Sequence, residues 1–304
     1  MNVLSLFDGI SACQLALNKA GYEVGDYHAS EIDKYAIQCT QSNYPDTNQL
    51  GDVLNWEQWE IDWSGIDLVT SGFPCQAWSL SGKQQGDKDP RGMLFWTMLD
   101  IISYAQQHNP EVNFFIENVK MKKEFEEYIT KHTSEALGTT YKTMINSSIV
   151  CPQNRTRYYW SSKPLSLPKE VESKLADILE DDPEDKYYYS EEQVAKLVPS
   201  NTNQDKAIKL LAHRANYRRN YQIFDPQGKT ETIDTAQGGG RKIGTLVDNR
   251  YRQLTPMEYE RLQTFPDNYT KGLSDSQRYK ALGNSWTVDV VSHCFKDMFN
   301  NLLH

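Results

Sequence analysis

The stretch Leu4-Ser-Leu-Phe-Asp-Gly9 indicates the fold more directly than any other part of the chain. Its apolar residues predict a buried strand over 2–7. A glycine turn then leads into a segment with helical spacing, 11–20, which Gly21 closes. A strand, a glycine turn and a helix in this order are typical of the first unit of a doubly wound sheet, where the turn approaches a nucleotide-like ligand.

Strand and helix signals alternate through the first 160 residues. The predicted strands are 27–30, 66–71 and 113–116, and the predicted helices are 34–42, 92–107 and 124–137. Alternation of this kind predicts the α/β class, with an open, mostly parallel, Rossmann-like sheet and helices on both faces.

The pattern changes after Trp160, where an acidic stretch is followed by tyrosine-, arginine- and glycine-rich sequence. Helical spacing returns at 255–262, with Pro256 in the first turn, and the amphipathic run 288–302 is expected to pack on the large domain. We therefore expect a large domain formed by 1–162 plus 253–304, and a smaller domain formed by 163–252.

Composition favours a soluble, cytoplasmic protein with no membrane segment and no metal. The chain of 304 residues has no apolar run near the roughly 20 residues that a membrane span needs. Its start has no basic segment and reaches an acid too soon for a signal peptide. Five cysteines, an odd number without a C-x-x-C pair, argue against a disulfide framework and a structural zinc site.

Charge is distributed unevenly along the chain, whose formal net charge is −9. Residues 170–200 hold ten acids and three bases, a net −7, whereas 201–252 hold ten bases and five acids, a net +5. A local basic surface can bind phosphate even when the total charge is negative. A merely solvated charged face explains the same pattern equally well.

Cys75 follows the apolar run Asp67-Leu-Val-Thr-Ser-Gly-Phe-Pro74 at a turn. A thiol placed there can act as a nucleophile, although a small residue filling a turn is the common alternative. The loop 79–96 carries glycines beside basic residues, which is typical of a lid over an anionic substrate and also of a plain surface loop.

Glu117 ends the apolar run Phe114-Phe-Ile116, where a carboxyl group can donate a hydrogen bond to a substrate or cap the following helix. Arg155 and Arg157 alternate with Thr156, so an extended segment would place both on one face, suited to carbonyl or phosphate oxygens. Surface salt bridges are the alternative for both arginines.

Two acids follow the Gly9 turn at positions suited to a nucleoside. Glu31 lies 22 residues beyond Gly9, where an acid commonly accepts hydrogen bonds from ribose hydroxyls. Gly51-Asp-Val53 is placed to end a third strand and to contact a base. An ordinary turn or helix cap remains an alternative at each position, and the sequence is not G-x-G-x-x-G.

Taken in order, these segments resemble the C5-cytosine-specific DNA methyltransferase family. The resemblance covers nearly the whole chain except about 163–230. Its matching segments are Phe7-Asp-Gly9, Glu31, Asp52, Phe73-Pro-Cys-Gln76, Glu117-Asn-Val119, Gln153-x-Arg155-x-Arg157, Arg252-x-Leu-Thr-Pro-x-Glu258, Arg261-Leu-Gln-x-Phe-Pro266 and Gly283-Asn-Ser285.

The resemblance implies S-adenosylmethionine as cofactor. The implied cofactor-binding residues are Phe7, Asp8, Gly9, Glu31, Ile32, Asp52, Val53, Pro74, Asn284, Ser285 and Trp286. Two positions depart from the family pattern. Ser11 stands where a second glycine is usual, and Trp286 replaces an aliphatic residue, so it is expected to stack on or cover the cofactor.

The resemblance also implies a catalytic set of Cys75, Glu117, Arg155 and Arg157. The Cys75 thiolate would attack C6 of cytosine, with Glu117 bonded at N3 and the exocyclic amine, so that C5 becomes able to accept a methyl group. The arginines would hold O2 and the phosphate. Because the target atom is inaccessible inside a duplex, the base must be flipped out.

The smaller domain would read a short sequence in double-stranded DNA. The DNA-binding candidates are Ser79, Ser81, Arg91, Arg218, Arg219, Gln237, Gly239, Arg241 and Lys242. The glycines at 238–240 would let the backbone approach DNA closely. A restriction endonuclease partner is compatible with the sequence but not implied by it.

Two other functions remain open. A tRNA cytosine methyltransferase of the same family is the first, although the arginine-rich recognition region and the absence of a Cys-Phe-Thr tripeptide weigh against it. A catalytically inactive DNA-binding relative is the second, against which the intact Cys75, Glu117 and Arg157 weigh.

Overall fold

The computed structural model describes residues 1–74, 92–200, 207–214, 221–235 and 242–300. The chain forms two compact units. The first unit comprises Met1–Ile145, Thr156–Leu167 and Val290–His304, and the second comprises Asn146–Arg155 and Pro168–Asp289. The chain therefore passes between the units several times, once directly between Arg155 and Thr156.

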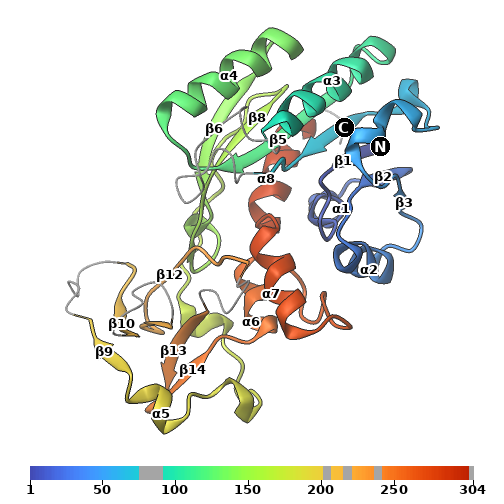
Figure 1. The fold of residues 1–304 in the computed structure, drawn as a ribbon. Coiled ribbons are helices and arrows are strands. Elements are labelled where there is room, and N and C mark those ends of the chain that lie inside the picture. The colour runs from blue at the N-terminus through green and yellow to red at the C-terminus, as the bar shows by residue number, and fades with distance from the viewer. Residues whose placement is uncertain (75–91, 201–206, 215–220, 236–241, 301–304) are drawn as a thin grey trace. The chain divides into compact units, whose positions relative to one another are not determined.

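A seven-stranded sheet forms the centre of the first unit, in the order β3-β2-β1-β4-β5-β8-β6 (Figure 1). Strands β1 to β5 pair in parallel, and β8 pairs antiparallel with β5. The strands are β1 Val3–Leu6, β2 Tyr27–Ser30, β3 Asn48–Gln49, β4 Leu68–Ser71, β5 Asn113–Val119, β6 Tyr141–Asn146 and β8 Thr156–Ser161. The predicted α/β fold with a large, mostly parallel sheet is confirmed.

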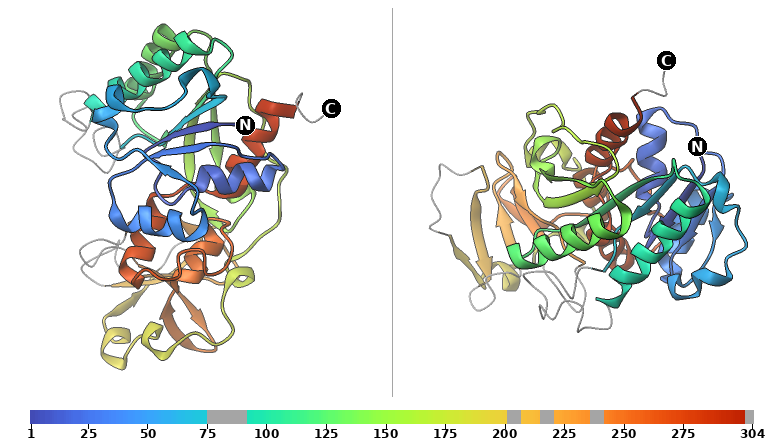
Figure 2. Two further views of the ribbon diagram at one scale, coloured as in Figure 1. Left: turned by 90° about the vertical axis from the view of Figure 1, so that its right-hand side faces the viewer. Right: turned by 90° about the horizontal axis from the view of Figure 1, so that it is seen from above.

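Helices cover both faces of this sheet, with α3 and α4 on one face and α1 and α8 on the other (Figure 2). The helices are α1 Ala12–Ala20, α2 Lys34–Asn43, α3 Met93–His108, α4 Lys123–Leu137 and α8 Val288–Phe299, with short 3-10 helices η1 Val53–Gln58 and η2 Trp63–Gly65. The 3-10 helix η4 Ser147–Ile149 belongs to the second unit. Every residue of β1 and β4 is buried. Burial on both faces explains why the only polar residues of these two strands are the small Ser5, Thr70 and Ser71.

The apolar core of the first unit lies between the sheet and α3. Phe95, Met98 and Ile102 of α3 are fully buried against strand residues that include Val69 and Phe114. The opposite face of the sheet is packed by α8, where the Phe115 and Phe295 ring centroids are 5.1 Å apart. These contacts hold the strands rigidly, so the loops at their carboxyl ends begin from fixed positions.

Strand β5 continues three residues beyond the predicted end at residue 116. Its last residues pair antiparallel with β8, with Val119 opposite Arg157. Glu117 therefore lies within a strand and not after one. It does not cap the next helix either, because the residue at the N-cap of α4 is Lys122.

The second unit is built on a five-stranded sheet, in the order β14-β13-β11-β10-β9, with a separate pair of β12 and β7. The strands are β7 Gln153–Asn154, β9 Leu197–Pro199, β10 Leu210–Arg214, β11 Gln222–Phe224, β12 Thr230–Glu231, β13 Ile243–Val247 and β14 Arg250–Gln253. Sequence periodicity did not predict these strands, because they are short and only partly apolar.

Two helices of the second unit, α5 Glu191–Val194 and α6 Pro256–Leu262, begin with a capping box. The unit also contains α7 Asp275–Asn284, with 3-10 helices η5 Leu175–Ile178 and η6 Asp185–Tyr187. At α6, Thr255 and Glu258 form a capping box. Glu258 also receives two hydrogen bonds from Arg252, at 2.6 and 2.8 Å, and both side chains are fully buried.

The functional division of the chain into a catalytic part and a recognition part stays a prediction. Residues 253–289, which we placed with the large domain, belong by their contacts to the second unit. Within the described ranges, no helix is long and apolar enough to cross a membrane.

Candidate active site

The turn after β1 is held in an unusual backbone conformation. Phe7, Gly9 and Ser11 all have positive φ, of 56°, 64° and 56°. Left-handed backbone is unfavourable for a residue with a side chain, so it persists only where neighbouring groups hold it. Here the Ser11 hydroxyl donates to Asp8 at 2.5 Å and receives a hydrogen bond from Thr40 at 3.2 Å. Serine is therefore accommodated where the family pattern has glycine.

Asp8 holds the same turn through hydrogen bonds that its carboxyl group accepts. Its carboxyl group accepts a hydrogen bond from the Tyr27 hydroxyl at 2.6 Å as well as the one from Ser11. Burial raises the pKa of Asp8, and these hydroxyl donors partly offset that effect. Burial and the neighbouring Asp8 raise the pKa of Tyr27 well above its ordinary value, so Tyr27 stays a hydrogen-bond donor.

Glu31 connects this turn to the end of β2. One carboxylate oxygen accepts from the Gly9 amide at 2.8 Å, and the other accepts from the amides of Ile32 and Asp33, both at 2.8 Å. Glu31 and Gly9 are therefore adjacent, as a shared nucleoside site at the carboxyl ends of parallel strands requires.

The third predicted cofactor segment follows β3. Asp52 caps η1 by accepting the Leu54 amide at 3.0 Å, so it has the structural role that we considered as the alternative. Val53 is 4% exposed and lies in the apolar core, which leaves only its backbone available to a ligand. Ile32 and Leu54 are instead 73% and 62% exposed. Leu54 was not predicted from the sequence.

Glu117 and Arg157 form an ion pair between neighbouring strands. Because Glu117 lies opposite Tyr159 and Val119 opposite Arg157, the two side chains are diagonal neighbours on one face. The Arg157 Nε lies 2.8 Å from the Glu117 carboxylate, and their side chains are 11% and 12% exposed. A carboxylate and a guanidinium so enclosed present an acceptor and several donors from a fixed position.

Asn118 ties this pair of strands to the segment that leads to Cys75. Its buried side-chain amide donates to the Phe73 carbonyl at 3.1 Å, and its oxygen accepts from the Val119 amide at 2.8 Å. Phe73 is itself fixed by packing on Phe95, with ring centroids 5.4 Å apart. Pro74, the predicted cofactor contact, is half-buried directly after this tether. Cys75 lies outside the described residues.

Arg155 and Arg157 have different partners. The Arg155 guanidinium is 3% exposed and donates to the carbonyls of Ile233, Gly283 and Ser285, all in the second unit. Only Arg157 belongs to β8. The two arginines therefore do not act together on one face of a single strand, as alternation in the sequence suggested.

The remaining predicted cofactor residues end α7 in the second unit. Asn284 is exposed, Trp286 is half-buried and Ser285 is 7% exposed. The Ser285 hydroxyl is buried without a hydrogen-bond partner. An unsatisfied hydroxyl of this kind is uncommon in a folded protein and is consistent with a ligand group bonding to it.

Most DNA-binding candidates fall outside the part of the chain that the structure describes. They are Ser79, Ser81, Arg91, Arg218, Arg219, Gln237, Gly239 and Arg241. Lys242 is described and half-buried, and its ammonium lies 5.6 Å from the centre of the Tyr279 ring. The glycines at 238–240 lie outside the described ranges as well.

The four described cysteines are all buried. Burial raises the pKa of the Cys13 and Cys151 thiols to about 12, and that of Cys294 also rises. A buried thiol that stays protonated is a poor nucleophile. In the described ranges, no three His, Cys, Asp or Glu side chains are grouped so as to hold a metal ion.

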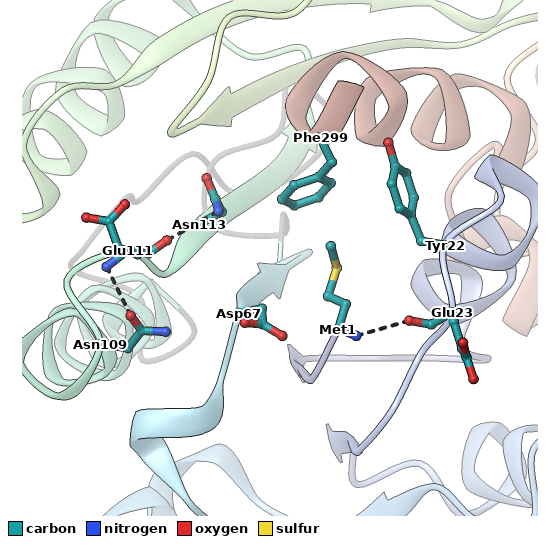
Figure 3. Close-up of a pocket in the computed structure, with 8 residues that line it drawn as sticks. All are labelled: Met1, Tyr22, Glu23, Asp67, Asn109, Glu111, Asn113 and Phe299. Carbon is teal, nitrogen blue, oxygen red and sulfur yellow. Dashed lines mark hydrogen bonds between the residues drawn. The ribbon is translucent and has the colours of Figure 1, made fainter. Parts of the chain in front are cut away.

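A pocket of about 480 Å³ lies at the opposite edge of the first sheet (Figure 3). It is lined by residues that precede or begin β1, β4 and β5, such as Met1, Asp67 and Asn113, together with Tyr22 and Phe299. Gly9 and Glu31 follow the carboxyl ends of β1 and β2, and Glu117 lies near the carboxyl end of β5. None of the described cofactor or catalytic candidates lines this pocket. In open α/β sheets ligands bind at the carboxyl edge, so this pocket is not the candidate site.

Comparisons with known proteins identify the family of the chain. The profile of the family described as C-5 cytosine-specific DNA methylase matches residues 1–300. The type II methyltransferase M.NlaX of Neisseria lactamica is 30% identical over 305 residues, covering 95% of this chain and 93% of the relative. The type II methyltransferase M.HhaI of Haemophilus parahaemolyticus is 29% identical over 314 residues, covering 96% and 92%.

A solved structure shows the same fold. The Entamoeba histolytica methyltransferase EhMeth superposes with a TM-score of 0.74 at 18% identity, covering 99% of this chain and 98% of that one. With the family profile spanning almost every residue, the chain belongs to the C-5 cytosine-specific DNA methylase family and is a DNA cytosine methyltransferase.

Proposed function

We propose that this enzyme transfers a methyl group from S-adenosylmethionine to C5 of a flipped cytosine in a short DNA sequence, through a covalent bond between Cys75 and C6. The observation that supports this most strongly is the Glu117–Arg157 pair beside the Asn118 tether. The enclosed acid and guanidinium lie on the neighbouring strands β5 and β8, and the next residue of β5 holds the backbone that leads to Cys75, which supports the proposal.

The proposed reaction begins with the Cys75 thiolate adding to C6. Glu117 hydrogen-bonds at N3 and the exocyclic amine, so that electron density moves toward C5, and Arg157 holds O2. C5 would then accept the methyl group as the S–CH3 bond of the sulfonium breaks, and S-adenosylhomocysteine would be the leaving group. Loss of the C5 proton, with water as base, and departure of the Cys75 sulfur restore the aromatic ring. Flipping the base out of the stack costs roughly a few kcal/mol in unstacking and unpairing.

The other cysteines support Cys75 as the nucleophile. Each of the four described thiols is buried, and the pKa is raised for Cys13, Cys151 and Cys294. Cys13, Cys151 and Cys294 are therefore unsuited to form a thiolate at neutral pH, and Cys39 is enclosed within the first unit. Cys75 is the remaining cysteine in the chain.

The turn after β1 fits S-adenosylmethionine. A Cβ at Gly9 would meet no atom within 4 Å, so the space beside this turn is open, and Glu31 lies next to it. Glu31 would bind the ribose, while the backbone of Gly9 and Val53 and the side chains of Ile32 and Asp52 would enclose the rest of the nucleoside. The cofactor supplies an electrophilic methyl group. The part played by Phe7, Asp8, Pro74, Asn284, Ser285 and Trp286 rests on the resemblance.

Replacing Glu31 with alanine is expected to weaken S-adenosylhomocysteine binding by about 10–100-fold, because hydrogen bonds to a charged group each contribute about 1.5–3 kcal/mol. Loss of the carboxylate also releases the amides of Gly9 and Ile32 that it now holds. Isothermal titration calorimetry measures the affinity. Glu60→Ala, which changes an exposed glutamate of the same unit, is the control and should bind normally. Equal affinities for the two variants would refute the ribose role.

Sequence recognition is proposed for 163–252. Two basic side chains of this segment already have partners within the second unit. Arg252 pairs with the buried Glu258, and the Arg250 guanidinium lies 3.7 Å from the Tyr188 ring centre. The proposed DNA contacts are the candidates named from the sequence, the basic residues Arg218, Arg219, Arg241 and Lys242, with Ser79, Ser81, Arg91, Gln237 and Gly239.

Purified protein is expected to place tritium from S-adenosyl-[methyl-³H]methionine on double-stranded DNA and not on tRNA. Digestion of the DNA to nucleosides should recover the label as 5-methylcytosine, and methylation-sensitive sequencing of DNA from an expressing host should reveal the recognised site. Labelled tRNA with unlabelled DNA would favour the tRNA alternative. No transfer to either, with S-adenosylhomocysteine still bound, would favour an inactive relative.

A further inference from the structure

Three buried side chains of the second unit form a polar cluster, which we call the hub. Gln153 and Gln263 are fully buried and Arg155 is 3% exposed. Gln153 lies in β7, Arg155 follows β7 directly, and Gln263 ends α6. Buried polar groups are costly unless they are satisfied, so the partners of the hub show which segments it holds.

The hub holds the backbone of the turn at the end of α7. Gln263 donates to the carbonyls of Leu282 and Ser285, both at 2.9 Å. Arg155 donates to the carbonyls of Gly283 and Ser285, at 3.1 and 2.8 Å. This turn carries Asn284, Ser285 and Trp286, the cofactor candidates of the second unit. Carbonyls at the end of a helix have no intrahelical donors, so these side chains fix the turn.

The hub also holds the segment that follows β12. The Ile233 amide donates to Gln153 at 3.0 Å, and the Ile233 carbonyl accepts from Arg155 at 3.3 Å. Thr230 and Glu231 pair with Gln153 and Asn154 as a short parallel ladder. This segment leads directly into 236–241, where the recognition candidates Gln237, Gly239 and Arg241 lie.

The two held segments also touch each other. A Cβ at Gly283 would lie 2.2 Å from the Asp234 carbonyl oxygen and 2.4 Å from its carbonyl carbon. Only glycine permits this approach of two backbones. The two segments leave no space between their backbones, and Arg155 donates hydrogen bonds to each of them. A shift of residues 233–235 would therefore displace the turn at 283–285.

We propose that Arg155 is a positioning residue that couples DNA recognition to cofactor binding through the hub. The inference rests on the proposed function. DNA bound by the candidates Gln237, Gly239 and Arg241 stabilises the adjoining segment 231–235, and Arg155 connects this segment to the turn that carries Asn284 to Trp286. Since coupling between two binding sites is reciprocal, DNA and cofactor each tighten the binding of the other by the same factor.

Arginine is required because a single side chain must reach three carbonyls. Its planar fork offers donors in fixed directions, whereas a lysine keeps the charge but presents one ammonium. Arg155→Lys is therefore expected to break part of the linkage without leaving an empty space the size of the side chain. A residue that instead touched the flipped base would lower kcat when altered, with no change in coupling.

The test measures S-adenosylhomocysteine affinity by calorimetry, without and with a DNA duplex containing the site found by sequencing. For the unaltered enzyme, DNA should tighten binding by about 5–150-fold, the usual range for coupled sites. Arg155→Lys should reduce this factor to near one while S-adenosylhomocysteine and DNA still bind singly. Arg261→Lys is the matched control, because Arg261 also donates to a backbone carbonyl, that of Ile178, in the same unit. In this control, DNA should tighten S-adenosylhomocysteine binding by the same factor as in the unaltered enzyme.

Gln153→Met provides a second variant if Arg155→Lys fails to fold, since it removes the acceptor for the Ile233 amide and keeps the side-chain length. It should also lower the factor. An unchanged factor in a folded hub variant, or a factor of one in the unaltered enzyme that methylates DNA, would overturn the inference and leave the proposed function standing. If the unaltered enzyme binds neither S-adenosylhomocysteine nor the DNA duplex, both the inference and the proposed function are overturned.

Discussion

Replacing Cys75 with alanine is expected to abolish methyl transfer while S-adenosylhomocysteine still binds. Without the thiolate, C5 of cytosine remains a poor nucleophile, and no described cysteine can substitute because all four are buried. Removal of a catalytic nucleophile lowers kcat by roughly 10⁴-fold or more in well-studied enzymes. A tritium-transfer assay with DNA measures the rate, and calorimetry measures retained binding.

A matched cysteine variant separates loss of the nucleophile from loss of structure. Cys39 is buried in α2, so Cys39→Ala removes a thiol of the same unit from its core. This variant should lower the thermal unfolding temperature and keep its kcat. Activity that survives in Cys75→Ala, or that is lost equally in Cys39→Ala at a temperature where both are folded, would refute the assignment.

Trapping the adduct tests the same bond directly. In DNA with 5-fluorocytosine at the target, methyl transfer leaves fluorine on C5, where a proton would otherwise be lost, so the Cys75–C6 bond cannot be released. The enzyme should migrate with the DNA in a denaturing gel, and mass spectrometry should place the attachment at Cys75. An active enzyme that gives no adduct would count against attack at C6.

The parallel sheet of the first unit could be predicted because strands that are buried on both faces are mostly apolar in sequence. Strands such as Val3–Leu6 and Leu68–Ser71 are wholly buried and carry no charged residue, only apolar residues with small Ser and Thr side chains. The second unit could not be predicted in the same way. Its strands, such as Leu197–Pro199 and Gln222–Phe224, have three residues each, too few to establish a period.

Sequence motifs predicted which residues belong to the candidate site. They did not predict the partners of each side chain, because spacing in the sequence does not show contacts. Alternation suggested that Arg155 and Arg157 share a face, yet the boundary between the two units falls directly after Arg155. The two guanidiniums therefore have partners in different units. Asn118 was quoted only as part of a motif, although its bond to the Phe73 carbonyl fixes the backbone before Cys75.

Replacing Glu117 with glutamine is expected to lower kcat by about 10²–10⁴-fold, the usual contribution of a positioned general acid or base. Glutamine keeps the size of the side chain and part of its contact with Arg157, but it can no longer share a proton with N3 of cytosine. Because the proposed role precedes methyl transfer, adduct formation with 5-fluorocytosine DNA should slow by a similar factor in single-turnover experiments. DNA affinity should change little.

A second variant is needed to separate loss of the Glu117–Arg157 ion pair from loss of the proposed bond between Glu117 and cytosine. Glu126 of α4 provides the comparison, because it is also a nearly buried glutamate of the first unit and it pairs with Lys142 of β6. Glu126→Gln should lower thermal stability about as much as Glu117→Gln, since each loses one partly enclosed ion pair, but it should keep kcat. If Glu117→Gln forms the adduct at the normal rate, Glu117 acts only as a structural partner of Arg157. The close fit of acid and guanidinium at 2.8 Å would then serve to hold β5 against β8, and activation of the base would require a different donor.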